Sequence, residues 1–159
     1  MASQDKIYTN MPIGPLGIIA MKGCRELGEL VDNHLINKRR TVAEINKGNI
    51  EYLGYLKDSY LIDAECLRFS SGEGKAVIKE SIRGYDLYIL CDVGNYSCTY
   101  TMHGMINHMS PDDHFQDIKR IISAIGGKAR RINVIMPLIY SGRQHKRVSR
   151  ESLDCAVAL

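Results

Sequence analysis

A basic loop near the end of the chain carries side chains suited to binding anions. Residues 143–147 read Arg-Gln-His-Lys-Arg and combine guanidinium groups with an amide and an ammonium group. A guanidinium pairs with phosphate through two parallel hydrogen bonds, and an amide can bond a nucleobase. The loop follows an apolar run that ends at Pro137, and open α/β sheets bind ligands at the carboxyl ends of their strands. The sequence therefore predicts a phosphate ligand here, with a solvated basic surface as the alternative.

Positive charge gathers around this loop. The chain has 21 Lys and Arg against 18 Asp and Glu, a net charge of +3, but nine of the basic residues and no acid lie between 119 and 150. Such clustering indicates a phosphate ligand, a nucleic acid or an acidic partner. Single-stranded nucleic acid needs aromatic side chains for stacking, and only Tyr140 lies nearby. A small phosphate ligand is therefore favoured, and no nucleic-acid partner is expected.

A glycine-rich segment, residues 70–75 (Ser-Ser-Gly-Glu-Gly-Lys), is a second candidate. It lacks the glycine spacing of a P-loop and the third glycine of a dinucleotide-binding loop. Taken by itself, it predicts a hairpin turn between two strands.

Cysteine and histidine residues suggest no metal site. Cys98, His103, His108 and His114 lack the close paired spacing of structural zinc ligands. Five cysteines without a dense framework indicate reduced thiols, and no apolar run reaches the roughly 20 residues of a membrane span. A cytoplasmic protein without a membrane partner is expected.

The elements that must position these residues alternate between strands and helices. Helix 111–125 has the clearest signals, because Ser110 is a suitable N-cap, Pro111 opens the first turn and Gly126 ends the pattern. Strands are predicted at 17–21, 61–69, 76–79, 87–91 and 132–136, helices at 24–37 and 41–47, and an irregular stretch at 94–109. Strand 87–91, helix 111–125 and strand 132–136 form a βαβ unit. The predicted fold class is α/β, a three-layer αβα arrangement with a mainly parallel sheet.

Length and composition fit one globular domain. The 159 residues are 45% hydrophobic and 25% charged. Residues 1–15 are interpreted as an N-terminal extension and residues 16–159 as the domain. A last helix, beginning at Ser149 or Ser152 and apolar over 153–159, predicts self-association and is interpreted as the point where a longer protein is truncated.

Several motifs together resemble the amino-terminal half of the ribose-phosphate pyrophosphokinase (phosphoribosyl pyrophosphate synthetase) family. In chain order they are Phe69-Ser-Ser-Gly-Glu73, Glu80-Ser-Ile-Arg-Gly84, Ile132-Asn-Val-Ile-Met-Pro137, Arg143-Gln144 and Ser149-Arg-Glu151. The resemblance covers residues 16–159 and implies a phosphoribosyltransferase-like fold. It also implies transfer of the β,γ-diphosphoryl group of Mg-ATP to the 1-hydroxyl of ribose 5-phosphate, with release of AMP.

The same resemblance implies an ATP site built from the turn and the loop, with the turn reaching over from a neighbouring subunit of a homo-oligomer. The implied ATP-binding residues are Phe69, Ser71, Gly72, Glu73, Arg143, Gln144 and His145. No catalytic or metal-ligating residue is implied within this chain. Mg²⁺ is expected with ATP, its ligands lie outside the chain, and the chain alone is expected to be inactive.

Two exchanges separate this chain from the common family pattern. Ser71 and His145 both stand where the pattern has Asp, and segments 38–60 and 94–109 are longer than in compact members. These lengths resemble an extended bacterial form of the family. A non-catalytic homologue that assembles with active subunits and regulates them remains the alternative.

Overall fold

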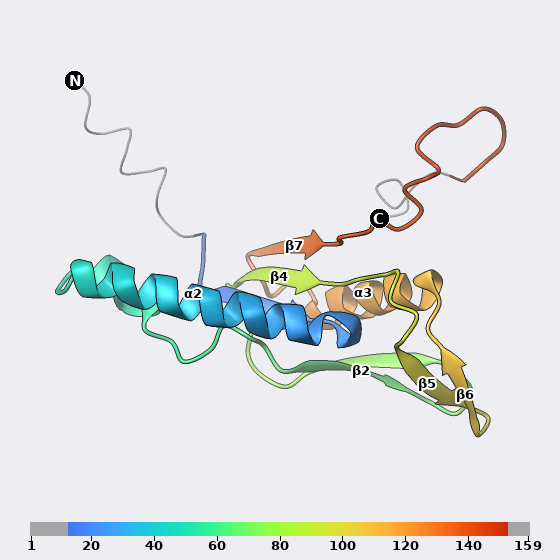
Figure 1. The fold of residues 1–159 in the computed structure, drawn as a ribbon, viewed down its shortest axis with the longest axis horizontal. Helices are drawn as coiled ribbons and strands as arrows, with labels where there is room; N and C mark the ends of the chain where they lie inside the picture. Colours follow the sequence, from blue (N-terminus) through green and yellow to red (C-terminus); the bar gives the residue numbers. More distant parts are fainter. Residues whose placement is uncertain (1–12, 153–159) are drawn as a thin grey trace.

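A small parallel sheet forms the centre of the molecule (Figure 1), whose computed structural model describes residues 13–152. Its strands are β1 (Leu16–Ala20), β4 (Asp86–Leu90) and β7 (Arg131–Ile135), in the order β1-β4-β7. Both strand pairs are parallel, and residue 61 adds a parallel bridge to Ile18 at the outer side of β1. The predicted mainly parallel sheet is confirmed, whereas the apolar helix expected at 153–159 lies outside the described residues.

One face of the sheet is covered by α2 (Arg25–Ile45), which follows the short 3-10 helix η1 (Lys22–Cys24) and precedes η2 (Ile50–Tyr55) (Figure 1). Ile18, Ile36 and Leu90 belong to the core between helix and sheet. The prediction of two helices, at 24–37 and 41–47, is wrong. Thr41 does not cap a second helix, because its Oγ1 donates a 3.0 Å hydrogen bond back to the Asn37 carbonyl within one continuous helix.

The opposite face is covered by α3 (Pro111–Ile125), as predicted. Its first turn is held by a reciprocal cap: the Ser110 Oγ accepts from the Asp113 amide at 3.2 Å, and the Asp113 carboxylate accepts from the Ser110 amide at 2.9 Å. Ile118, Ile121 and Ile125 are buried against Leu87 and Ile89 of the sheet. The two helices and the sheet between them make the three-layer αβα fold.

Two antiparallel hairpins extend from these layers. The first, β2 (Ala64–Arg68) and β3 (Gly74–Ile78), packs on the core beside α3. The second, β5 (Thr99–Met102) and β6 (Met105–His108), lies in segment 94–109, so the prediction of irregular structure there is wrong. Its two-residue turn needs positive φ angles at both positions, 49° at His103 and 79° at Gly104.

The basic stretch 119–150 is not a single surface. Arg120 donates to the buried carboxylate of Asp117, and Arg131 donates to Asp86 through Nε at 2.7 Å and an NH2 group at 2.6 Å. These two cations therefore stabilise the fold through acidic partners within the chain. Among helices within residues 13–152, none has the length and apolar character that crossing a bilayer requires.

The Asp86 ion pair gives the fold an acid-sensitive contact at the amino ends of β4 and β7. Hydrogen bonds from Arg131, joined by one from Asn133, lower the pKa of Asp86 below its ordinary value of 3.8 despite the opposing effect of burial. A lowered folded-state pKa stabilises the protein above the unfolded-state pKa, and this contribution is lost as the pH falls through the folded value. In thermal melts from pH 7 to pH 2.5, Asp86→Asn should lose less stability than the wild type below pH 4. Parallel curves for the two proteins would contradict this.

Candidate functional site

The turn between β2 and β3 presents one half of the ATP-binding residues implied by the resemblance. The Phe69 amide donates to the Glu73 carbonyl at 2.8 Å, and the Gly72 amide donates to the Phe69 carbonyl at 2.9 Å. The Ser71 hydroxyl lies 3.3 Å from a Glu73 carboxylate oxygen. The Phe69 ring is 54% exposed, so its face is free to meet a planar ligand. The turn therefore holds a ring, a hydroxyl and a carboxylate close together on the surface.

The β5–β6 hairpin supports this turn from the side. The His103 amide donates to the Ser70 carbonyl at 2.9 Å. A Cβ atom added at Gly72 would lie 2.7 Å from the Met102 Sδ. Gly72 also has a φ of 91°, which side-chain-bearing residues rarely adopt. The backbone angle favours glycine here, and a side chain would also displace the flexible Met102 side chain.

We expect Gly72→Ala to lower the free energy of unfolding by about 1–2 kcal/mol, because alanine is strained at this φ angle. Urea unfolding of the purified chain measures the change. Gly54→Ala is the matched control, since no atom lies within 4 Å of its added Cβ and its φ is not positive. Equal unfolding midpoints for the two variants would show that the turn tolerates a side chain.

A buried ion pair anchors the base of the turn. Arg68, the last residue of β2, donates to both carboxylate oxygens of Asp117 on α3 at 2.7 and 3.0 Å. The Arg68 and Asp117 side chains are only 7% and 5% exposed. The Arg68 guanidinium also lies over the Tyr100 ring of β5 at 5.2 Å. This one side chain thus ties the turn to both α3 and the second hairpin.

The second half of the implied residues lies in the loop that follows β7. Its start is fixed by Tyr140, whose ring stacks on Phe115 at 4.1 Å and whose hydroxyl donates to Asp112 at 2.6 Å. Because this ring is already packed, it is not a platform for nucleobases. Beyond it the backbone amide of Gln144 donates to the backbone carbonyl of Ser141 at 2.9 Å. The loop therefore leaves the sheet in a defined direction.

Arg143 and Gln144 line an open hollow of about 410 Å³ together with Lys146, Glu151 and Ser152. The Ser152 hydroxyl donates to the Gln144 side-chain oxygen at 3.0 Å. Within residues 13–152 neither Arg143 nor Lys146 forms an ion pair, so both cations are free for an anion. His145 does not line the hollow. Lys146 belongs to the basic loop that the sequence singled out, whereas the contributions of Glu151 and Ser152 were not expected.

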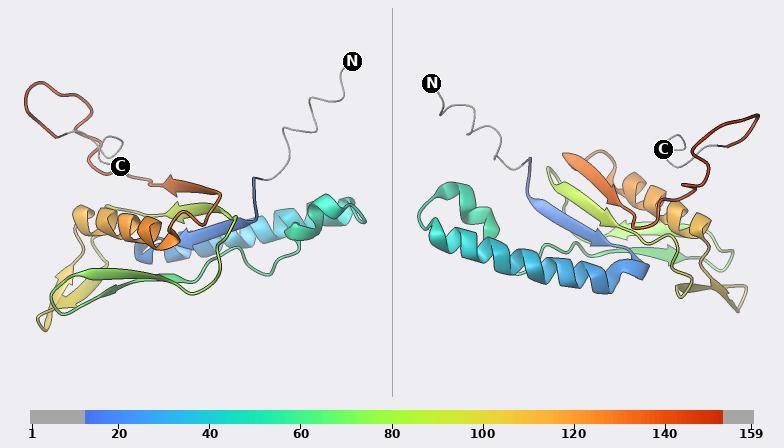
Figure 2. Two further views of the ribbon diagram at one scale, coloured as in Figure 1. Left: turned by 180° about the vertical axis from the view of Figure 1, so that it is seen from behind. Right: turned by 45° about the horizontal axis from the view of Figure 1, so that its top comes forward.

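The two halves do not meet within one chain. In Figures 1 and 2 the turn lies beside β5, the loop extends beyond β7, and α3 lies between them. No hydrogen bond or ion pair joins residues 69–73 to residues 141–152. The turn and the loop are therefore not in direct polar contact within one chain.

Two histidine and two cysteine side chains of the described residues take structural positions. His108 Nδ1 lies 2.8 Å from the Tyr96 carbonyl, and His114 Nε2 lies 2.9 Å from the Asn95 carbonyl. Burial raises the pKa of the Cys66 and Cys91 thiols to about 12, so both stay protonated at neutral pH and are poor nucleophiles. No cluster of three or more possible metal ligands occurs among residues 13–152.

A parallel sheet covered by helices on both faces, with a cationic loop beyond the carboxyl end of a strand, is an open α/β architecture, in which ligands commonly bind outside the carboxyl ends of the strands. The family model for the N-terminal domain of ribose phosphate pyrophosphokinase matches residues 16–159, and the chain belongs to that family. This is a kinase-type enzyme family that makes phosphoribosyl pyrophosphate and uses ATP and Mg²⁺. No curated protein matches the chain.

Proposed function

We propose that this chain is the ATP-contacting, subunit-associating domain of a ribose-phosphate diphosphokinase. The reaction converts ATP and ribose 5-phosphate into 5-phosphoribosyl 1-diphosphate and AMP. Membership of the family supports this proposal, and so does the unpaired Arg143 beside Gln144 in a hollow at the carboxyl end of β7. The same biosynthetic role makes the cytoplasm the proposed location.

Each implied residue has a chemical role in this proposal. The exposed Phe69 ring stacks on adenine, and the Ser71 hydroxyl and Glu73 carboxylate bond the base or the ribose. Gly72 keeps the turn close to the nucleotide without a side chain.

On the loop, Arg143 pairs with a phosphate through its guanidinium group, and Gln144 offers an amide beside it. His145 stands where the family pattern has Asp, so it bonds the nucleotide as an imidazole rather than a carboxylate. Phosphoryl transfer depends on positioning and charge stabilisation, which this domain supplies only in part. The chain alone is therefore proposed to bind ATP without turning it over.

The ATP site is proposed to form between subunits. The turn of one copy and the loop of another would complete it, which accords with their separation by α3 in a single chain (Figure 2). The protein would then act as a homo-oligomer that associates through this domain. Ribose 5-phosphate is the second substrate of the assembled enzyme.

Mg²⁺ enters this proposal only with ATP. The described residues offer no group of three or more side chains fit to hold a metal ion, so they do not form a magnesium site by themselves. Glu151, the one carboxylate among the described residues that line the hollow, accepts from the Val148 amide at 3.1 Å. No step is therefore assigned to metal ligands of residues 13–152.

Mixing two variants tests the shared site. Phe69→Ala removes the turn's ring and Arg143→Ala removes the loop's cation, so each alone should bind ATP weakly in calorimetric titrations. In a mixed assembly, one interface combines both intact halves and should recover part of the high-affinity sites. A 1:1 mixture that binds no better than either variant alone would contradict the shared site.

A regulatory homologue is a second candidate, because both exchanges, at Ser71 and His145, remove a carboxylate. Such a protein would assemble with active subunits and change their activity without catalysing the reaction. To separate the enzyme domain from the regulator, the chain is added to an active enzyme of the family and the rate of AMP release is measured. The regulator is favoured if the chain changes the rate of the active enzyme but does not restore activity to a variant of that enzyme whose ATP-binding turn is disabled.

A further inference from the structure

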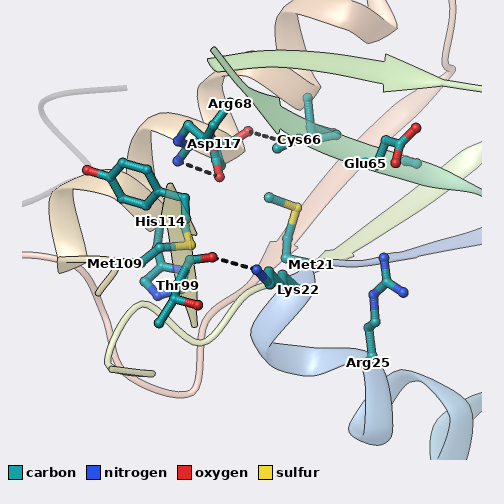
Figure 3. Close-up of a pocket in the computed structure, with 13 residues that line it drawn as sticks. Met21, Lys22, Arg25, Glu65, Cys66, Arg68, Thr99, Met109, His114 and Asp117 are labelled. Carbon is teal, nitrogen blue, oxygen red and sulfur yellow. Dashed lines mark hydrogen bonds and ion pairs between the residues drawn. The ribbon is translucent and has the colours of Figure 1, made fainter. Parts of the chain in front are cut away.

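A cavity of about 460 Å³ lies outside the carboxyl end of β1 (Figure 3). The cavity is lined by Met21 and Lys22, which directly follow β1, and by Arg68 of β2, Tyr100 of β5 and Asp117 of α3. None of the residues implied to contact ATP lines it. The volume lies in the range of small-molecule sites. The cavity is therefore separate from both halves of the proposed ATP site.

The cavity adjoins the end of β1, one of the two strands between which the strand order of the sheet reverses. From β1 the chain passes through α2 to residue 61 on one side of β1, whereas β4 pairs with the other side and leads through α3 to β7. Strand order thus reverses between β1 and β4, and the Met21 amide donates to Leu90 at this point. Open α/β sheets bind ligands outside the strand ends at such a reversal.

The charges around the cavity favour an anion. Glu65 is already paired with Lys79 at 3.2 Å, and Asp117 is shared between Arg68 and Arg120. Lys22 donates only to the Thr99 carbonyl, and Arg25 forms no hydrogen bond or ion pair with any residue of 13–152. Two cations without acidic partners therefore remain at the cavity.

Arg25 also lies at the end of its own helix where the helix dipole disfavours a positive charge. It opens α2, whose N-cap residue makes no side-chain hydrogen bond to the first turn. The amino-terminal end of a helix carries partial positive charge, so a cation there is unfavourable and an anion is favourable. A bound anion would pair with Arg25 and offset this unfavourable placement.

Arg68 forms part of the cavity wall, and its buried guanidinium is held in place by both carboxylate oxygens of Asp117. Met21, Met109 and Ile121 line the rest of the cavity and provide apolar, adaptable contacts.

We propose that this cavity binds a small phosphate monoester with a ring-sized organic body. The phosphate lies between Lys22, Arg25 and the start of α2, and the body packs on the methionines and Tyr100. The site is additional to the proposed ATP site and does not depend on it.

Phenyl phosphate serves as the probe for amide chemical-shift mapping on the isotope-labelled 159-residue chain. Amide chemical-shift changes that saturate with phenyl phosphate are expected at residues 22–26 and 99–100. Inorganic phosphate and phenol should each bind more weakly, because the first lacks the ring and the second lacks the phosphate. Arg25→Gln should weaken phenyl phosphate about 5-fold, because one charge-assisted contact is lost at a partly exposed site. The variant should fold, since it removes an unfavourable charge at the helix start.

Two control variants test whether binding is specific to this cavity. Lys38→Gln removes a cation from the exposed surface of the same helix and should leave the affinity unchanged. Arg143→Ala should also leave it unchanged, so failure of the ATP proposal would not affect this result. Shifts confined to residues 143–152, equal affinity for inorganic phosphate, or an Arg25→Gln affinity equal to wild type would each overturn the proposal.

Discussion

Asp117→Ala should lower the free energy of unfolding by about 3–5 kcal/mol, the largest effect expected for a single polar residue of this chain. The carboxylate is 5% exposed and accepts from Arg68 at 2.7 and 3.0 Å and from Arg120 at 2.7 Å. Its removal leaves the buried Arg68 guanidinium without a counterion in a region of low dielectric. Urea unfolding followed by circular dichroism measures the loss.

Asp58→Ala provides the matched control for this experiment. It also breaks an aspartate–arginine pair, with Arg40 at 3.2 Å, but both side chains are well exposed. Exposed pairs contribute about 0–1 kcal/mol, so the control should change little. If Asp117→Ala cost no more than Asp58→Ala, the Arg68 pair would not anchor the β2–β3 turn.

Arg143→Ala should weaken ATP binding about 10- to 150-fold, because it removes a charge-assisted contact of ~1.5–3 kcal/mol. The guanidinium lines the hollow beyond β7 and has no ion-pair partner in residues 13–152. Its loss should therefore leave the melting temperature unchanged. Titration calorimetry with ATP, beside a thermal melt, separates the two effects.

Arg130→Ala is the control for Arg143→Ala. Arg130 belongs to the same basic stretch but directly precedes β7, at the amino end of the sheet, and its side chain is exposed. Its removal should have little effect on ATP binding. Equal, small losses in both variants would mean that the charge cluster is a solvated surface, and the regulatory role would then be favoured.

The parts of the fold that the sequence predicted are those set by local signals. Helix α3 carries its cap at Ser110, its proline at 111 and its glycine at 126, and it begins and ends as these residues require. The single helix α2 was missed because Thr41 can bond a carbonyl of its own helix as readily as it caps a new one. The β5–β6 hairpin was missed because its strands are only four residues long and because its turn needs His103 in the left-handed backbone conformation, which histidine seldom adopts.

The functional residues divide in the same way. The turn at 69–73 and the loop at 143–145 are contiguous motifs, so the sequence alone could propose them, although their roles remain predictions. The cavity beyond β1 joins Lys22, Arg25, Arg68 and Tyr100 from separate elements. No spacing rule in the sequence reveals that these side chains converge, because the folding of two hairpins and α3 brings them together.

The hydrogen bond from the His103 amide to the Ser70 carbonyl makes the second hairpin a reporter of the turn. Coupling free energies are reciprocal, so a nucleotide that orders residues 69–73 must also suppress local opening of residues 99–108. Amide hydrogen exchange would register this as slower deuterium uptake in a segment that is not part of the proposed nucleotide site. By the same linkage, shortening the hairpin would loosen the turn and raise the entropic cost of ordering it around a ligand.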